Sequence, residues 1–111
     1  PKVLQMSTHP NYLYRMTTIF AVTTMAPSLD TDTILNSVLT TMLPMVQDSV
    51  PNIRFNVAKA FEALSTELSK TPEGRRSIQD KINPALQVLS EDRDADVRYY
   101  ATHALQTTAN V

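Results

Sequence analysis

Apolar residues recur along this chain at helical spacing. The clearest run follows the i, i+4, i+7, i+8 pattern of one face of an α-helix: Ile53, Val57, Ala60, Phe61, Leu64 and Leu68. Similar runs begin at Leu35, Ile78 and Val97. A weaker one consists of Leu13, Met16, Phe20 and Thr24. Because the alternation typical of half-buried strands is found nowhere over a useful length, the pattern predicts an all-α protein.

Capping residues mark the ends of these helices. Thr71-Pro72-Glu73 has the form of an N-cap, a proline at the first helical position and an acidic residue in the first turn. Similar signals predict helices at about 1–8, 11–26, 31–47, 51–69, 72–90 and 94–108. Pro44 and Pro84 fall late inside two of these helices. A proline there removes one backbone hydrogen bond, so we expect both helices to bend.

The prolines also reveal a repeat. Pro1, Pro44 and Pro84 are 43 and 40 residues apart, and Pro10 precedes Pro51 by 41. This period is typical of HEAT or armadillo helix-pair repeats, which stack because one pair cannot bury its own apolar face. We therefore predict an open α-solenoid of about two and a half HEAT repeats in one fragment. The predicted repeats are 1–27 (truncated), 30–69 and 71–111.

A pair of charges recurs with the same period. Asp48 precedes Arg54 by six residues, and Asp92 precedes Arg98 by six, at an offset of 44. Arginine can bind a carboxylate through two parallel hydrogen bonds. The spacing therefore predicts a ladder of arginine–aspartate pairs between adjacent repeats. The alternative is that these charges contact a ligand.

Composition excludes most chemistry. The 111 residues carry a net charge of −1, which disfavours nucleic-acid binding. Cysteine is absent and glycine occurs once, so thiolate sites and glycine-rich phosphate loops are excluded. The two histidines, His9 and His103, are too few for a zinc site. The acidic run 91–96 lacks the central glycine of a calcium loop. We therefore expect no enzyme, metal, cofactor or small-molecule substrate.

Two tyrosines near the start suggest a contact surface. Tyr12 and Tyr14 flank Leu13, which we expect to point inward as part of the weaker apolar run. The two rings would then not both be buried, and with Arg15 they are residue types enriched at protein-binding hot spots. The alternative is that a tyrosine closes the interface between repeats, as Tyr99 and Tyr100 could do in the last repeat.

Three strings point to a family. PKVLQMSTHPNYLYRMTTIF, IRFNVAKAFEAL and DADVRYYATHAL resemble the C-terminal HEAT repeats of protein phosphatase 2A scaffold (A, or 65 kDa regulatory) subunits, and their wording is similar to that of fungal members. The resemblance covers almost the whole chain. Together with a start at Pro1 inside a helical pattern, it leads us to expect a piece of a longer protein. We expect this piece alone to be marginally stable or prone to associate.

The resemblance also implies a function. In that family a non-catalytic scaffold holds the phosphatase catalytic subunit on the turns of its C-terminal repeats. Its N-terminal repeats, outside this sequence, hold interchangeable B-type regulatory subunits. Nucleic acid, membrane and small molecules are not implied as partners, and the implied location is cytoplasm and nucleus. The implied contact residues are Asn11, Tyr12, Arg15, Val50, Asn52, Arg54, Lys59, Ala95 and Arg98.

One departure and one alternative remain. Eight residues separate Pro44 from Ile53, where the other units place eleven and twelve between the matching positions. The first helix of the middle repeat should therefore be about one turn shorter, and the sequence leaves the register at Asp48 and Val50 open. The alternative function is a generic HEAT adaptor that binds a protein on its concave helical face. Exposed aromatic and arginine side chains on the turns would favour the phosphatase scaffold, and such side chains along the second helices would favour the adaptor.

Overall fold

The computed structural model describes residues 11–109, and every regular element in that range is helical. The α-helices are α2 (Tyr12–Met25), α3 (Thr31–Thr33), α4 (Leu39–Met42), α5 (Pro51–Leu68), α6 (Pro72–Ser77), α7 (Asn83–Ser90) and α8 (Ala95–Thr108). The predicted all-α fold is confirmed. The short helix predicted at 1–8 lies outside the described residues.

The short elements join into longer helices. A π-helical turn, Ile34–Val38, links α3 to α4, and a 3-10 turn, Leu43–Gln47, continues α4. Another π-helical turn, Ile78–Ile82, links α6 to α7. The resulting continuous helices, 31–47 and 72–90, agree with the sequence prediction. The ends of α2, α5 and α8 lie within one or two residues of the ends predicted from the sequence.

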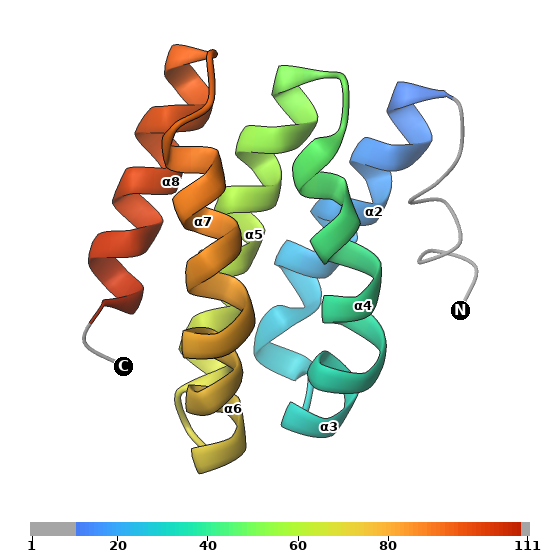
Figure 1. Cartoon of the computed structure of the whole chain (residues 1–111). Coiled ribbons are helices and arrows are strands. Elements are labelled where there is room, and N and C mark those ends of the chain that lie inside the picture. Colours follow the sequence, from blue (N-terminus) through green and yellow to red (C-terminus); the bar gives the residue numbers. More distant parts are fainter. Residues whose placement is uncertain (1–10, 110–111) are drawn as a thin grey trace.

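The helices form two layers of an open stack. Figure 1 shows α3–α4 and α6–α7 in one layer and α2, α5 and α8 in the other, with successive helices antiparallel. The helical body measures 36 × 32 × 19 Å, so it is flat rather than a closed bundle. This arrangement is that of a HEAT-type α-solenoid. The turns before α5 and α8 lie at the same end as the start of α2, and we call this row of turns the ridge.

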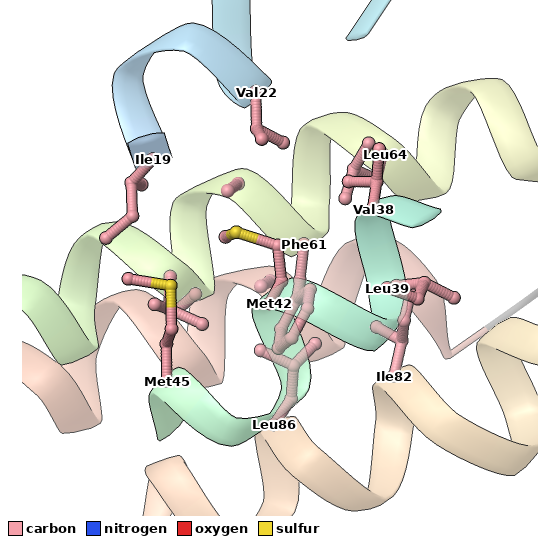
Figure 2. Close-up of a cluster of buried hydrophobic side chains, with 14 of the residues drawn as sticks. Ile19, Val22, Val38, Leu39, Met42, Met45, Phe61, Leu64, Ile82 and Leu86 are labelled. Atoms are coloured by element: carbon pink, nitrogen blue, oxygen red, sulfur yellow. The ribbon is translucent and has the colours of Figure 1, made fainter. Parts of the chain in front are cut away.

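The core lies between the two layers, and α5 is at its centre. Ile53, Phe61 and Leu68 of α5 are fully buried, as are Met42 of α4 and Leu86 of α7. Figure 2 shows the side chains of this cluster, contributed by α2, α4, α5 and α7 and by the turns beside α4 and α7. Helix α5 packs against α2 on one side and against α8 on the other. Without α5, neither neighbouring helix pair would have its apolar face covered.

At the opposite end from the ridge, the connection between pairs is tight. Gly74, the single glycine, is buried, and a Cβ placed on it would lie 1.9 Å from the carbonyl oxygen of Leu68. A larger residue would therefore push α6 away from the end of α5. At this same end the hydroxyl groups of Thr31 and Thr71 are 3.2 Å apart and hydrogen bonded.

The helical winding changes near both prolines, while the bends predicted there stay a prediction. Pro44 lies inside the 3-10 turn Leu43–Gln47, while Pro84 is the second residue of α7, two residues after the π-helical turn Ile78–Ile82 ends. Both windings differ from the α-helical pattern that a proline interrupts. Helix 31–47 is shorter than helix 72–90 by about half a turn, less than the full turn expected from the sequence.

The prediction that Leu13 points inward is wrong. Leu13 is 67% exposed, and Phe20 of the same predicted run is also exposed. The buried face of α2 is instead formed by Met16, Ile19 and Val22, with Tyr12 packed partly against the core. Helix α2 carries large apolar residues on more than one of its faces. Apolar spacing alone therefore predicts the wrong face as the buried one. Met16 is the one member of the weaker run that is buried.

The exposed apolar face of α2 generates a prediction about association. Leu13 and Phe20, two turns apart on one face of α2, are large apolar side chains exposed to solvent. Exposed apolar patches of this kind drive contacts between molecules. We expect the 111-residue chain to self-associate in sedimentation velocity experiments. Leu13→Gln with Phe20→Gln should shift it toward monomer, while the same change at exposed Val88 should not.

A monomeric chain with a cooperative melting temperature well above about 60 °C would contradict this expectation.

Candidate protein-binding ridge

Two arginine–aspartate pairs connect the turns of successive repeats along the ridge. Arg15 donates from Nε and Nη2 to the two carboxylate oxygens of Asp48, at 2.7 and 3.1 Å. Arg54 donates in the same way to Asp92, at 2.8 and 3.1 Å. Both pairs are largely buried. The predicted ladder between adjacent repeats is therefore confirmed, and it includes Arg15.

Each aspartate also organises its own turn. The Asp48 carboxylate accepts the backbone N–H of Val50 at 3.0 Å, and the Asp92 carboxylate accepts that of Asp94 at 2.9 Å. The following arginine then returns to the aspartate's own carbonyl oxygen. Arg54 Nη1 donates to the carbonyl of Asp48 at 2.7 Å, and Arg98 Nη1 to that of Asp92 at 2.8 Å. The two turns are thus in the same register, which the sequence alone leaves open.

The ladder changes the acidity of Asp92. Burial alone would raise the pKa of this carboxyl group. The hydrogen bonds from the Arg54 side chain and the Asp94 backbone, together with the charges of Arg54 and Arg93, outweigh burial and hold the pKa of Asp92 below its ordinary value. The charged form of Asp92 is therefore the one that the fold stabilises.

Asn11, Tyr12 and Asn52 form a second connection on the outer side of the ridge. The Asn11 side chain accepts the backbone N–H of Leu13 at 2.8 Å and so caps α2. Asn52 Nδ2 donates to the hydroxyl oxygen of Tyr12 at 2.7 Å. The Tyr12 ring packs partly on the core while its oxygen reaches the surface. Tyr12 thus helps to close the interface between repeats and also contributes to the exposed ridge.

An aromatic cluster joins α5 to α8 just below the ridge. The rings of Phe55 and Tyr100 stack with centroids 5.2 Å apart, and Tyr99 meets Tyr100 edge-on at 5.1 Å. Lys59 Nζ lies 5.1 Å from the centre of the Tyr100 ring, a cation–π distance. Tyr99 is 64% exposed. The sequence signal for this cluster is the pairing of Phe55 with Tyr99 at the offset of 44, which places aromatic residues at matching positions of two repeats.

The residues implied by the family resemblance differ in how accessible they are. Five are exposed on or near the ridge: Asn11, Asn52, Lys59, Ala95 and Arg98. Tyr12, Arg15 and Val50 are half-buried. Arg54 is 5% exposed and its guanidinium group is occupied by Asp92, so its charge stabilises the ridge from within. Contact with a partner stays a prediction for all nine.

The rest of residues 11–109 offers little other chemistry. No group of three or more histidine, aspartate or glutamate side chains there could hold a metal ion. In the same range no helix has the length and apolar character needed to cross a membrane. His103 lies 3.2 Å from a carboxylate oxygen of Glu62, as part of a polar contact between α8 and α5.

The fold and the ridge define an α-helical repeat protein whose ordered surface is a row of turns. No protein-family model matches the chain. Over 69 residues, 62% of the chain, it is 56% identical to the PP2A regulatory A-subunit of Schizosaccharomyces pombe. Over 96 residues, 86% of the chain, it is 36% identical to the protein of the same name from Saccharomyces cerevisiae. The beta isoform of the human 65 kDa regulatory A-subunit is 37% identical over 60 residues, 54% of the chain.

The chain is therefore homologous to a segment of the regulatory A-subunits of protein phosphatase 2A, which confirms the resemblance found in the sequence. It spans only 12%, 15% and 9% of the length of these three curated relatives. The relatives are named as regulatory and not as catalytic subunits, in agreement with a non-enzymatic protein.

The ladder generates a prediction about stability. Arg54→Gln leaves the buried carboxylate of Asp92 without its partner, so we expect the free energy of unfolding to fall by about 3 kcal/mol or more. Arg98→Gln is the same chemical change at an exposed position and should cost less than about 1 kcal/mol. Urea unfolding followed by circular dichroism measures both, and equal losses would show that the ladder contributes no special stability.

The lowered pKa of Asp92 gives a pH dependence. Because the folded-state value lies below the ordinary value of 3.8, Asp92 contributes stability that is fully present above that pH and is lost as pH falls through the folded-state pKa. Asp92→Asn should therefore flatten the acid side of the plot of unfolding free energy against pH. Asp96→Asn, at an exposed position in the same segment, is the matched control. A wild-type slope in Asp92→Asn would refute the assignment.

Proposed function

We propose that this chain is a non-catalytic scaffold segment of a type 2A serine/threonine phosphatase, and that its ridge binds the catalytic subunit. The observation that carries this proposal is the ladder, because it holds successive turns at a fixed spacing while Asn52, Ala95 and Arg98 stay exposed beside it. The names of the relatives support the scaffold role. The proposal includes binding of B-type subunits by other repeats and a location in cytoplasm and nucleus.

The physical advantage of the ridge is preorganisation. Association is opposed by the ordering of loops and side chains at the interface. Here the turns are already ordered by buried ion pairs, by helix caps and by the Tyr12–Asn52 hydrogen bond. A partner can therefore bind several turns at once without ordering them first.

One observation favours the adaptor alternative. Tyr99, Tyr100 and Lys59 lie on the second helices α5 and α8, where a concave face would bind cargo. However, exposed Tyr14 occupies the first turn of α2 and exposed Arg98 the first turn of α8, both close to the ridge. This distribution of exposed aromatic and arginine side chains supports the phosphatase scaffold.

The test changes Tyr12 and Asn52, the two residues hydrogen bonded to each other on the outer side of the ridge. In the full-length protein, Tyr12→Ala combined with Asn52→Ala removes an aromatic ring and an exposed amide without disturbing either ion pair. We expect binding to the catalytic subunit of a type 2A phosphatase to weaken by more than about 2 kcal/mol, roughly thirtyfold in Kd. Isothermal titration calorimetry with the purified partner measures the change. Arg15 is not a suitable target because its loss would also disrupt the ladder.

Two further variants make the result specific. Tyr12→Phe keeps the ring and should retain most of the affinity. Tyr99→Ala reports on the second-helix face. If the Tyr12/Asn52 variant binds normally while Tyr99→Ala binds weakly, the contact lies on the concave face and the ridge proposal fails.

A further inference from the structure

A groove of about 520 Å³ opens on the layer formed by α2, α5 and α8. Its largely apolar lining includes Thr23 of α2, Lys59 and Ala63 of α5, and Tyr100 and Thr107 of α8. Because α5 packs against both α2 and α8, the groove lies between helices of neighbouring repeats. Its size is within the range of ligand sites in proteins. We call it the second-helix groove.

The carboxylate that lines the second-helix groove is already engaged. Glu62 accepts the hydroxyl proton of Thr107, and its two oxygens lie 3.2 and 3.3 Å from Nδ1 of His103. Both partners belong to α8, so the carboxylate is directed toward that helix. The hydroxyl groups of Thr23 and Thr66 donate to backbone carbonyls of their own helices. These threonines therefore have no proton to offer to a ligand.

Two other donors in the groove have no acceptor among residues 11–109. Lys59 lies one turn before Glu62 on α5, but it forms no ion pair with any carboxylate in that range. Its Nζ is instead 5.1 Å from the centre of the Tyr100 ring. The hydroxyl group of Tyr100 also forms no hydrogen bond in that range, although the ring is half-buried. An ammonium group and a phenol hydroxyl thus remain available in one groove.

This set of donors defines the chemistry of the ligand. An ammonium group and a phenol hydroxyl both donate to an acceptor such as a carboxylate, while the apolar lining favours an apolar group beside it. A basic ligand would find the Glu62 carboxylate occupied. A dianionic phosphate would be repelled by Glu62, which lines the same groove. A peptide in which aspartate or glutamate stands next to a large apolar residue carries both groups that fit.

We propose that the second-helix groove is a docking site for an acidic peptide segment of a partner protein. Lys59 and Tyr100 bind the carboxylate of that segment, and its neighbouring apolar side chain packs on Ala63 and the rest of the apolar lining. This site goes beyond the proposed function, because it lies on the helices and leaves the ridge to the catalytic subunit. The scaffold then holds a second protein on a different face.

The first experiment identifies the ligand class without assuming a partner. A random-peptide display library is selected on the immobilised full-length protein, after removal of peptides that also bind the Lys59→Met variant. We expect the selected peptides to be enriched in aspartate or glutamate next to a large apolar residue. Peptides without an acidic residue, or no peptide that distinguishes the wild-type protein from Lys59→Met, would overturn the proposal.

The second experiment measures the affinity of a selected peptide by fluorescence anisotropy. Lys59→Met keeps the alkyl chain over the Tyr100 ring but removes the charge, so we expect the Kd to rise about tenfold or more. Tyr100→Phe keeps the ring and removes only the hydroxyl, and should raise the Kd about fivefold. Lys81→Met is the matched control, because Lys81 is exposed and lies in the other layer of helices. An equal effect of Lys59→Met and Lys81→Met would refute the groove as the binding site.

Competition separates this site from the ridge, since Lys59 is also among the contact residues implied by the family resemblance. The labelled peptide should stay bound when the purified catalytic subunit is added at saturation. The Tyr12/Asn52 variant should bind the peptide with the wild-type Kd. Release of the peptide by the catalytic subunit would show that the groove belongs to the catalytic-subunit contact, and the inference would then be wrong. Normal peptide binding without any binding of the catalytic subunit would refute the proposed function and leave this inference standing.

Discussion

Burial of apolar surface between helix pairs is the constraint on which this structure depends. The central helix, α5, is covered by α2 and α8 in its own layer and by α4 and α7 from the other. Ile53, Phe61 and Leu68 are consequently removed from solvent by three successive units rather than by one. Each buried side chain of this size contributes on the order of 1.5–3 kcal/mol. The stability of any one pair is therefore a property of its neighbours, as expected for a repeat protein.

Apolar contact alone does not fix how far one pair slides along the next, and the ion pairs of the ridge supply that register. A bidentate arginine–carboxylate contact tolerates little displacement, and Asp48 and Asp92 bind backbone N–H groups of their own turns as well. Buried ion pairs often add little net stability, because both charges lose water. Their role here is positional: they align the turns that carry Tyr12, Asn52 and Arg98 into one continuous edge.

Helix positions could be predicted from apolar spacing and capping residues, the repeat from the proline spacing, and the ladder from the aspartate–arginine pair that recurs at an offset of 44. The buried face of α2 could not, since Leu13, Met16, Ile19 and Phe20 offer two competing apolar stripes and only packing against α5 selects one. The π-helical turns were also missed, as no residue type marks them. The Tyr12–Asn52 and Lys59–Tyr100 contacts join residues of different repeats. Such pairings become visible only when the angle between helices is known.

Adjacent repeats are connected more strongly at the ridge than at the opposite edge of the stack, where Thr31 and Thr71 lie. Two buried arginine–aspartate pairs connect the turns along the ridge. Away from the ridge, Thr31 and Thr71 share a neutral hydrogen bond, and partly exposed Glu62 contacts Thr107 and His103 between α5 and α8. Bending of the solenoid would therefore widen the gap at the threonine end first, while the distance between the aspartate turns stays nearly constant. The ridge would therefore keep the same length when the curvature of the solenoid changes. A protein bound along the ridge could keep its contacts while the rest of the superhelix opens or closes around it.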